Sequence, residues 1–124
     1  MKEEVKNGRY EDKNGDVCWF KDGKYHREDG PAVEWADGTK FWYKDGKYHR
    51  EDGPAFEYAD GDKFWYFNGT YHRVDGPAIE WSDGYKEWFL NGVQFSEEHF
   101  NKYQLNKKLE TTLEERPSVK KVKI

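Results

Sequence analysis

The chain has 124 residues, enough for one hydrophobic core but not for two independent ones, so we expect a single folded domain. Acidic and basic residues nearly balance at a formal net charge of −4, which argues against nucleic-acid binding through a basic surface. Aliphatic residues are scarce while aromatic residues make up 19 % of the chain, so rings have to supply most of the core.

The N-terminal segment and the cysteine content indicate a reducing compartment. Residues 1–6 contain no apolar run of the kind found in a secretory signal, and no stretch is apolar enough to predict a membrane span. Cys18 is the only cysteine, so no disulfide can form within the chain. It occupies the repeat position that Phe41 and Phe64 fill later, which favours a packed apolar residue over a nucleophile. We therefore expect a cytoplasmic protein.

A 23-residue repeat runs through most of the chain. Lys-Tyr-His-Arg-Glu-Asp-Gly-Pro-Ala occurs at residues 24–32 and again at residues 47–55, and a third copy with two changes lies at residues 70–78. A period of about 20 to 50 residues is typical of an array of small units that stabilise their neighbours and that usually bind other molecules. The sequence predicts full units at 18–40, 41–63 and 64–86, partial units at 9–17 and 87–95, and thus a β-repeat domain over 1–95, a helix over 96–116 and a basic tail over 117–124.

Each full unit is predicted to hold two strands, for example residues 40–44 and 54–58, because both stretches are rich in aromatic residues. Asp37-Gly38, and its equivalents in the next two units, predict a tight type I′ hairpin turn. The longer connection over residues 45–53 is predicted as an ordered loop that leads into Pro54. Two strands per unit, each about 4.8 Å from the next, predict a mainly β fold: a single elongated, twisted antiparallel meander sheet with a C-terminal helical cap.

The repeat pattern ends after Phe95, where a helix is predicted. Ser96 is a suitable N-cap, and the acidic residues that follow it suit the first turn of a helix starting at Glu97. We expect this helix to cover the last strand and the free sheet edge with Phe100, Tyr103 and Leu109. The tail over residues 117–124 alternates valine with lysine, which leaves an added edge strand, a disordered end and a contact with an anionic partner as alternatives.

The recurring histidines and arginines invite a chemical interpretation. Equivalent histidines of successive units are separated by two strand spacings, about 10 Å, which is too far for them to share a metal ion. They are therefore predicted to be structural loop braces held by hydrogen bonds. The arginines could bind a phosphate or carboxylate ligand, or each could form an ion pair within its own unit, with the aspartate two residues on or with a strand glutamate. The residues concerned are His26, His49 and His72, and Arg27, Arg50 and Arg73.

The aromatic columns are the better candidates for a binding surface. Side-chain alternation places Phe41 and Tyr43 on one face of the sheet and Trp42 on the other. A single-layer sheet cannot bury both faces, so some rings are expected to stay accessible, unless lysine side chains such as Lys40 and Lys44 cover the tryptophans. The candidate partner-binding residues are Trp19, Trp42, Trp65, Trp88, Tyr43, Tyr66, Arg27, Arg50 and Arg73.

The aromatic strand and its turns resemble a known repeat. Residues 41–49, Phe-Trp-Tyr-Lys-Asp-Gly-Lys-Tyr-His, and residues 58–61, Tyr-Ala-Asp-Gly, resemble the MORN repeat, a 23-residue hairpin unit, and the likeness extends over residues 9–95. The chain departs from that family in having arginine where a glycine usually follows the histidine. It is most similar to a variant group, the His-Arg-x-Asp-Gly-Pro-Ala repeat proteins of bacteria, phages and large viruses.

The resemblance implies an elongated scaffold for protein contacts, in some members with phospholipid association or dimerisation, and no enzymatic activity. The sequence also lacks a Gly-rich phosphate loop and a clustered metal-ligand spacing. We therefore expect a non-enzymatic protein-binding module without cofactor or metal, and a homodimer is a further candidate assembly. A narrower expectation is a phage inhibitor of a host defence protein in the host cytoplasm. The alternative is a protein that binds a nucleotide or a phospholipid headgroup.

Overall fold

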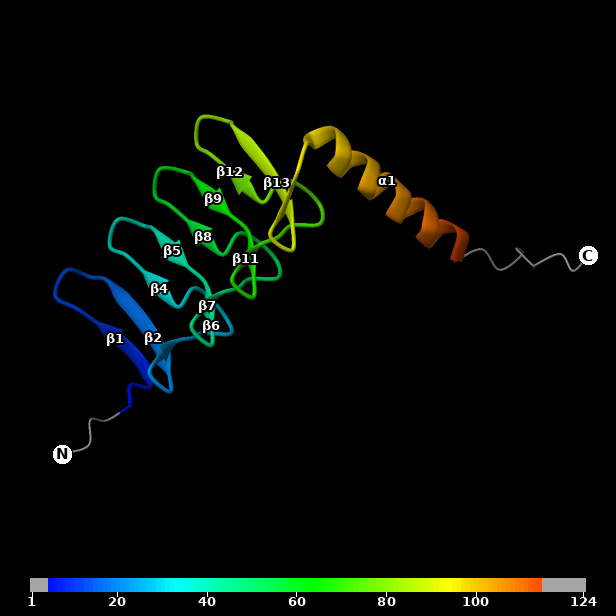
Figure 1. Cartoon of the computed structure of the whole chain (residues 1–124). Coiled ribbons are helices and arrows are strands. Elements are labelled where there is room, and N and C mark those ends of the chain that lie inside the picture. The colour runs from blue at the N-terminus through cyan, green and yellow to red at the C-terminus, as the bar shows by residue number, and fades with distance from the viewer. Residues whose placement is uncertain (1–4, 115–124) are drawn as a thin grey trace, which may run out of the picture.

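The structure is a computed structural model and describes residues 5–114. It is mainly β: one large antiparallel meander sheet of hairpins and a C-terminal helix that packs on its last strands (Figure 1). The strands of the large sheet follow one another in the order β1, β2, β4, β5, β8, β9, β12, β13, β14, with β3 paired to β2, while β6 with β7 and β10 with β11 form separate hairpins. The elements are β1 Gly8–Glu11, β2 Val17–Lys21, β3 Lys24–Tyr25, β4 Val33–Glu34, β5 Lys40–Phe41, β6 Tyr43–Lys44, β7 Lys47–Tyr48, β8 Phe56–Glu57, β9 Lys63–Phe64, β10 Tyr66–Phe67, β11 Thr70–Tyr71, β12 Ile79–Glu80, β13 Lys86–Leu90, β14 Val93–Phe95 and α1 Glu97–Glu114.

The register of the large sheet separates the side chains into two chemically different faces. Phe41 stands opposite Val33 on one side and Phe56 on the other, whereas Lys40 stands opposite Glu34 and Glu57. Since neighbouring residues of a strand point to opposite faces, one face receives apolar side chains and the other a row of alternating charges. Opposite charges directly across two strands favour this register over a shift by one residue.

Each long strand changes its partner at a tryptophan. Trp42 donates its backbone N–H to the oxygen of Ala55, at 2.6 Å, and accepts the N–H of His49, at 3.1 Å. The strand predicted over residues 40–44 is therefore divided into β5, which belongs to the large sheet, and β6, which pairs with β7. The prediction of a loop throughout residues 45–53 was wrong, because Lys47 and Tyr48 form a strand there.

The type I′ turn lies in the connection that was predicted as a loop, and not at Asp37-Gly38 as predicted. Asp45 and Gly46 have φ angles of 52° and 77°, the two positive values that a type I′ turn requires. At the other turn only Gly38 is positive, at 97°. Its N–H bonds to the oxygen of Trp35, and the N–H of Trp35 bonds to the oxygen of Thr39. That pattern is a three-residue hairpin loop with the glycine in the bulge position, not a type I′ turn.

The core is thin and repeats with the array. One buried position is an alanine in all three units, at Ala32, Ala55 and Ala78. Each follows the proline of its loop and stands where the backbones of adjacent strands meet, since Ala55 accepts a bond from Trp42 and donates one to Phe64. The other buried apolar side chains combine rings with aliphatic groups, so the core is less purely aromatic than composition predicts. They are Val17, Val33, Phe41, Phe64, Ile79, Leu90 and Phe100.

The C-terminal helix begins as predicted but covers less than expected. Ser96 Oγ accepts the N–H of His99 at 3.2 Å, as an N-cap should. Of the residues in α1, Phe100 is buried at 1 % exposure, whereas Tyr103 and Leu109 are exposed. The prediction that Leu109 packs on the sheet was wrong, whereas Tyr103 keeps a ring contact with Phe95 of β14, 6.3 Å between centroids. The main strand contacts of α1 are with β13 and β14, and the helix then leads away from the sheet (Figure 1). The tail over residues 117–124 lies outside the described residues.

Within residues 5–114, no helix combines the length and the apolar character that crossing a bilayer requires.

Candidate functional site

The three repeated loops lie on the face of the sheet that carries the tryptophans. We call this side, formed by loop residues 26–31, 49–54 and 72–77 with the tryptophans beneath them, the loop face. On it each arginine lies over an indole, with the guanidinium carbon 3.8 Å or 3.9 Å from the ring centroid. This distance is well within the range of a cation–π interaction. Arginine, and not the lysines named from the sequence, therefore covers these rings; the pairs are Arg27 on Trp19, Arg50 on Trp42 and Arg73 on Trp65.

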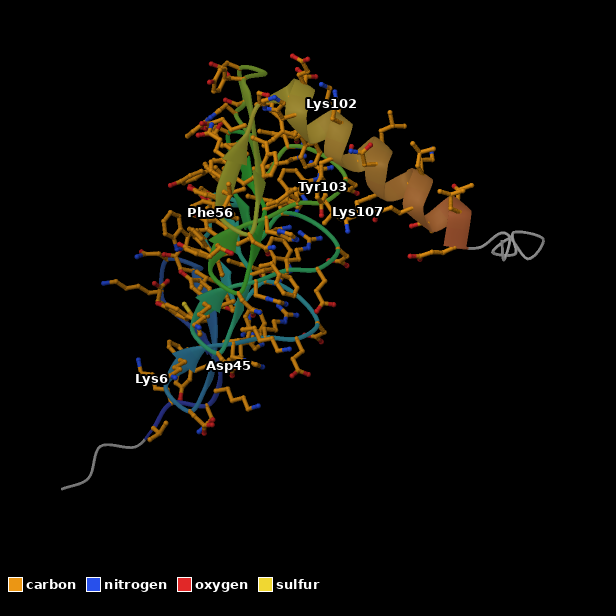
Figure 2. The ribbon with its side chains drawn as sticks, turned by 45° about the vertical axis from the view of Figure 1, so that its right-hand side comes forward. Lys6, Asp45, Phe56, Lys102, Tyr103 and Lys107 are labelled. Carbon is orange, nitrogen blue, oxygen red and sulfur yellow. The ribbon has the colours of Figure 1, made fainter. Side chains whose placement is uncertain are left out.

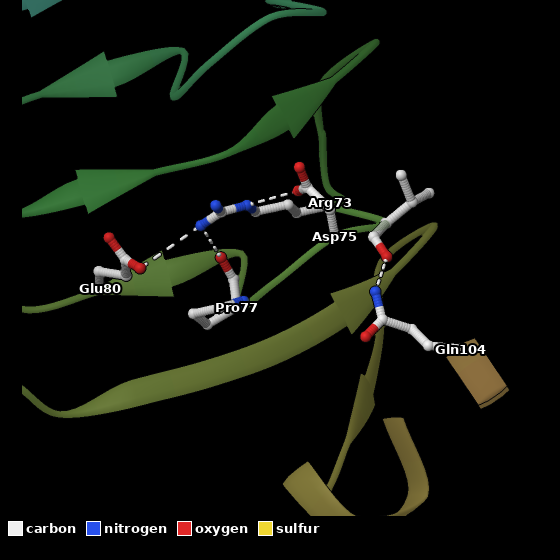
Figure 3. Close-up of polar contacts among 6 residues, drawn as sticks. Arg73, Asp75, Pro77, Glu80 and Gln104 are labelled. Carbon is white, nitrogen blue, oxygen red and sulfur yellow. Dashed lines mark hydrogen bonds and ion pairs between the residues drawn. The ribbon is translucent and has the colours of Figure 1, made fainter. Parts of the chain in front are cut away.

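The guanidinium groups also form ion pairs within their own loops. In the third loop, Arg73 Nε lies 2.8 Å from Asp75 Oδ1, and its Nη1 donates to the oxygen of Pro77 at 3.1 Å and lies 3.4 Å from Glu80 Oε1 (Figure 3). The first two loops repeat the aspartate and proline contacts. Hydrogen bonds from the arginines lower the pKa of Asp29 and of Asp52. These groups are therefore engaged by the protein itself, which weakens the case for an anionic ligand.

The glycine of each loop provides the space that the arginine occupies. A Cβ atom at Gly53 would lie 2.7 Å from Cζ of Arg50, closer than such atoms can approach, and Gly30 and Gly76 show the same crowding at 2.9 Å. A side chain at these positions would displace the guanidinium, so glycine is favoured here by contact and not by a positive φ. The guanidinium of each loop bonds to the aspartate and to the proline oxygen and lies against the glycine, which accounts for the order Arg-x-Asp-Gly-Pro.

The histidines bind each unit to the next. Nδ1 of His26 accepts the backbone N–H of Asp45 at 3.0 Å, and His49 and His72 do the same for Asn68 and Asn91 at 3.1 Å and 2.9 Å. The ring proton is then on Nε2, which lies 3.5 Å from Glu28 in the first loop and from Glu51 in the second. Each acceptor holds the type I′ turn of the following unit, so the bond is a brace between units and not within one loop.

Open hollows separate successive loops. The first has a volume of about 730 Å³ and is lined by Trp42, Lys44 and the charged residues of the first two loops, and the next, between the second and third loops, is about 470 Å³. No buried side-chain polar atom is left without a hydrogen-bond partner among residues 5–114, and no group of histidine, cysteine or carboxylate residues in that range could hold a metal ion. Both acidic and basic side chains line the two hollows.

At the last unit the helix takes the place that a fourth loop would have. Among residues 5–114 no arginine stacks on Trp88, and a hollow of about 570 Å³ beside it is lined by Phe100 and Gln104 of α1. Gln104 donates a hydrogen bond to the backbone oxygen of Val74 in the third loop (Figure 3). The four candidate tryptophans thus have two environments, three under arginine and one beside the helix.

The opposite side of the sheet, which we call the ring face, is built from stacked phenylalanine and tyrosine rings. Phe56 projects from the side turned away from α1 (Figure 2). Neighbouring rings of one column lie 4.6 to 5.5 Å apart between centroids, a spacing at which aromatic pairs attract. Burial is the main cause that raises the pKa of Tyr43 and Tyr66 well above the usual range. The column runs through Tyr10, Phe20, Tyr25, Tyr43, Tyr48, Tyr66, Tyr71 and Phe89.

The candidate residues named from the sequence are therefore divided between two faces. Tyr43 and Tyr66 lie within the ring column and are half-buried, whereas the candidate tryptophans and arginines lie on the loop face. Cys18 is half-buried, and burial is the main cause that raises its pKa, which disfavours the reactive thiolate.

The most exposed set of repeated rings was not among the candidates. Trp35, Tyr58 and Trp81 occupy one repeat position and are 44 %, 40 % and 37 % exposed. We call these three residues the exposed aromatic row. They belong to the ring face, because their centroids lie 4.9 Å from Phe41, 4.3 Å from Phe56 and 5.2 Å from Phe64, respectively. The signal in the sequence was an aromatic residue three positions before the glycine of each three-residue hairpin loop, Gly38, Gly61 or Gly84.

Comparison of the chain with protein-family models, with characterised proteins and with solved structures found no match. The resemblance to the MORN repeat therefore stays a prediction from the motifs.

Proposed function

We propose that the protein is a non-enzymatic binding module that recognises a protein partner through the exposed aromatic row. The observation that carries the proposal is the repetition of a large exposed ring at one position in three successive units, Trp35, Tyr58 and Trp81. Tryptophan and tyrosine are enriched among the residues that contribute most binding free energy to protein interfaces. Each new unit adds one such ring to the same edge of the ring face.

The row is held in place before any partner arrives. Trp81 contacts Phe64 edge to face, and its Nε1 donates to Glu87 Oε2 at 3.2 Å. Trp35 is held in a similar edge contact with Phe41. A ring that is already ordered loses little conformational freedom on binding, so more of its contact free energy contributes to affinity.

The loop face supports a partner less well. Its arginines are engaged by aspartate, proline and tryptophan within each unit, and a partner would have to replace these contacts before using the guanidinium groups. The same internal contacts argue against the alternative of a nucleotide or headgroup ligand. The narrower prediction of an inhibitor of a host defence protein has no observation of its own in the structure and stays a prediction.

A capture experiment with matched variants tests the proposal. The full chain, a variant carrying Trp35→Ala, Tyr58→Ala and Trp81→Ala, and a control carrying serine at three exposed leucines of α1 are each used as bait in an extract of the native host. The control residues, Leu105, Leu109 and Leu113, are exposed apolar side chains outside the row.

We expect a protein that is captured by the wild type and by the leucine control but is lost with the aromatic variant. Circular dichroism of each bait must show the same folded spectrum. Equal recovery of the same protein by all three baits would contradict the proposed surface.

A further inference from the structure

The N-terminal end of the sheet is a strand whose outer edge has no partner among the described residues. β1 pairs with β2 on one side only, and all four of its residues are exposed. At the other end, β14 leads into α1, which packs on β13 and β14. An uncovered edge strand presents backbone N–H and C=O groups that can pair with a further strand.

The backbone groups that face this open edge can be assigned from the register. Trp19 donates its N–H to the oxygen of Ala32 at 2.7 Å and accepts the N–H of His26 at 3.0 Å, so both of its backbone groups point away from β1. Arg9 stands opposite Trp19 and therefore makes no backbone bond to β2. Because bonding alternates along an antiparallel strand, Tyr10 bonds inward to β2, while the N–H and C=O of Arg9 and Glu11 point outward.

We propose that two copies of the chain associate through antiparallel pairing of their β1 strands about a two-fold axis at Tyr10. Arg9 of one copy then stands opposite Glu11 of the second copy, and Glu11 opposite Arg9. Both are outward-facing residues, so each such pair exchanges two backbone hydrogen bonds. The same pair joins opposite charges across the strands.

The sequence of the edge selects this register over its neighbours. Arg9 and Glu11 already attract each other within one strand, at 2.7 Å, and both are about half exposed. A shift that centres the pairing on Arg9 would place two arginines opposite each other, and a shift that centres it on Glu11 would place two glutamates opposite each other. Like charges directly across two strands are destabilising. The register centred on Tyr10 avoids both repulsions.

The proposed pairing also continues both faces of the sheet. The guanidinium carbon of Arg9 lies 5.6 Å from the ring centroid of Trp19, on the loop face, while the Tyr10 ring lies 5.5 Å from that of Phe20, on the ring face. A two-fold axis perpendicular to the sheet keeps each face on its own side, so the two Tyr10 rings would join the ring columns of the two copies. Such an interface uses the same surface of both copies and closes as a dimer.

This inference goes beyond the proposed function and does not depend on it. The exposed aromatic row begins at Trp35, and Trp35 lies outside both β1 and β2, the strands at the proposed interface. A dimer would present two copies of the row to a partner. The interface involves one short strand per copy, so we expect a weak association that depends on protein concentration.

Charge reversal at the edge provides the test. Sedimentation velocity over a concentration series should show a monomer–dimer equilibrium for the wild type. Arg9→Glu gives an edge with two glutamates, and Glu11→Arg gives an edge with two arginines, so the dimer dissociation constant of each should rise by about ten- to a hundredfold. An equimolar mixture of the two variants should form a heterodimer, because each arginine again faces a glutamate.

Amide exchange provides a readout that a general loss of stability would not give. The backbone N–H groups of Arg9 and Glu11 should exchange more slowly as the wild-type concentration rises, while that of Tyr10, already bonded to β2, should not change. A control with serine at Leu105, Leu109 and Leu113 should dimerise like the wild type.

Three results would overturn the inference: a wild type that stays monomeric at all soluble concentrations, charge-reversal variants that dimerise unchanged, or a dimer that the leucine control abolishes.

Discussion

The loop face and the ring face contain the same repeat but use it differently. On the loop face the conspicuous residues turn inward: Arg50 lies on Trp42 and pairs with Asp52, and His49 holds the turn of the next unit. On the ring face, the exposed fraction of the side chains increases from Phe64 in the core to Tyr58 at the edge. A repeated polar motif can therefore serve the architecture of the sheet, while less conspicuous aromatic residues form the accessible surface.

The largest expected effect is on the ring face. Phe64→Ala removes a buried ring that contacts Phe56 and Trp81, and should lower the free energy of unfolding by about 3–5 kcal/mol. Trp35→Ala removes a ring that is 44 % exposed and should cost only about 1 kcal/mol. Urea unfolding monitored by circular dichroism measures both. Equal losses would show that the graded burial of this face has no energetic counterpart.

The next effect concerns the glycine of the loop face. Gly53→Ala places a methyl group 2.7 Å from Cζ of Arg50, which should move the guanidinium off Trp42 and destabilise the fold by about 1–3 kcal/mol. Because the clash needs the arginine, Gly53→Ala should cost clearly less in an Arg50→Ala background, and a double-mutant cycle in urea measures this coupling. Additive losses would mean that the glycine serves some other purpose.

A smaller effect is expected at the brace between units. His49→Ala removes the acceptor of the Asn68 N–H and should cost about 1 kcal/mol, the net contribution of one hydrogen bond. Exchange of the Asn68 amide should become faster in the same variant. His99→Ala is the matched control, since that histidine is an exposed residue of α1. If the two variants lose the same stability, the brace contributes nothing.

The period of the sequence predicts the main architecture because it reports a backbone arrangement that recurs. The two strands that each unit contributes to the large sheet, the helix start at Glu97 and the separation of Phe41 from Trp42 all follow from spacing and alternation. The turn assignment failed because the first two units each contain three Asp-Gly pairs, two of which stand at hairpin turns, and the spacing does not say which of those two is the type I′ turn. The third unit shows which turn is type I′, since its equivalent of Asp45-Gly46 is Asn68-Gly69, the pair that most favours two positive φ angles.

The candidate site was harder to predict because the alternation of side chains along a strand shows which face a side chain is on but not how far it is buried. Trp42 and Trp35 both occupy repeated aromatic positions, and only the fold shows that Arg50 covers Trp42 while Trp35 stays exposed. The stacking of Arg50 depends on a contact from Gly53 across the loop. The period shows that the arginine and the glycine recur together, but it does not show that the guanidinium packs on a tryptophan of the adjacent strand.

The smallest effect distinguishes the faces by pH. The hydrogen bond from Arg50 lowers the pKa of Asp52 below its ordinary value of 3.8. A lowered pKa stabilises the fold at pH values above the pKa of the unfolded chain, and this contribution is lost as the pH falls through the pKa of the folded state. Asp52→Asn should therefore be slightly less stable than the wild type at pH 6, and the gap should close below about pH 3.9. Thermal unfolding at several pH values measures the difference in stability between Asp52→Asn and the wild type. Tyr58→Phe on the ring face is the control, because its difference from the wild type should not change over this acidic pH range. A gap for Asp52→Asn that stays constant down to pH 2 would mean that the carboxylate does not act through its charge.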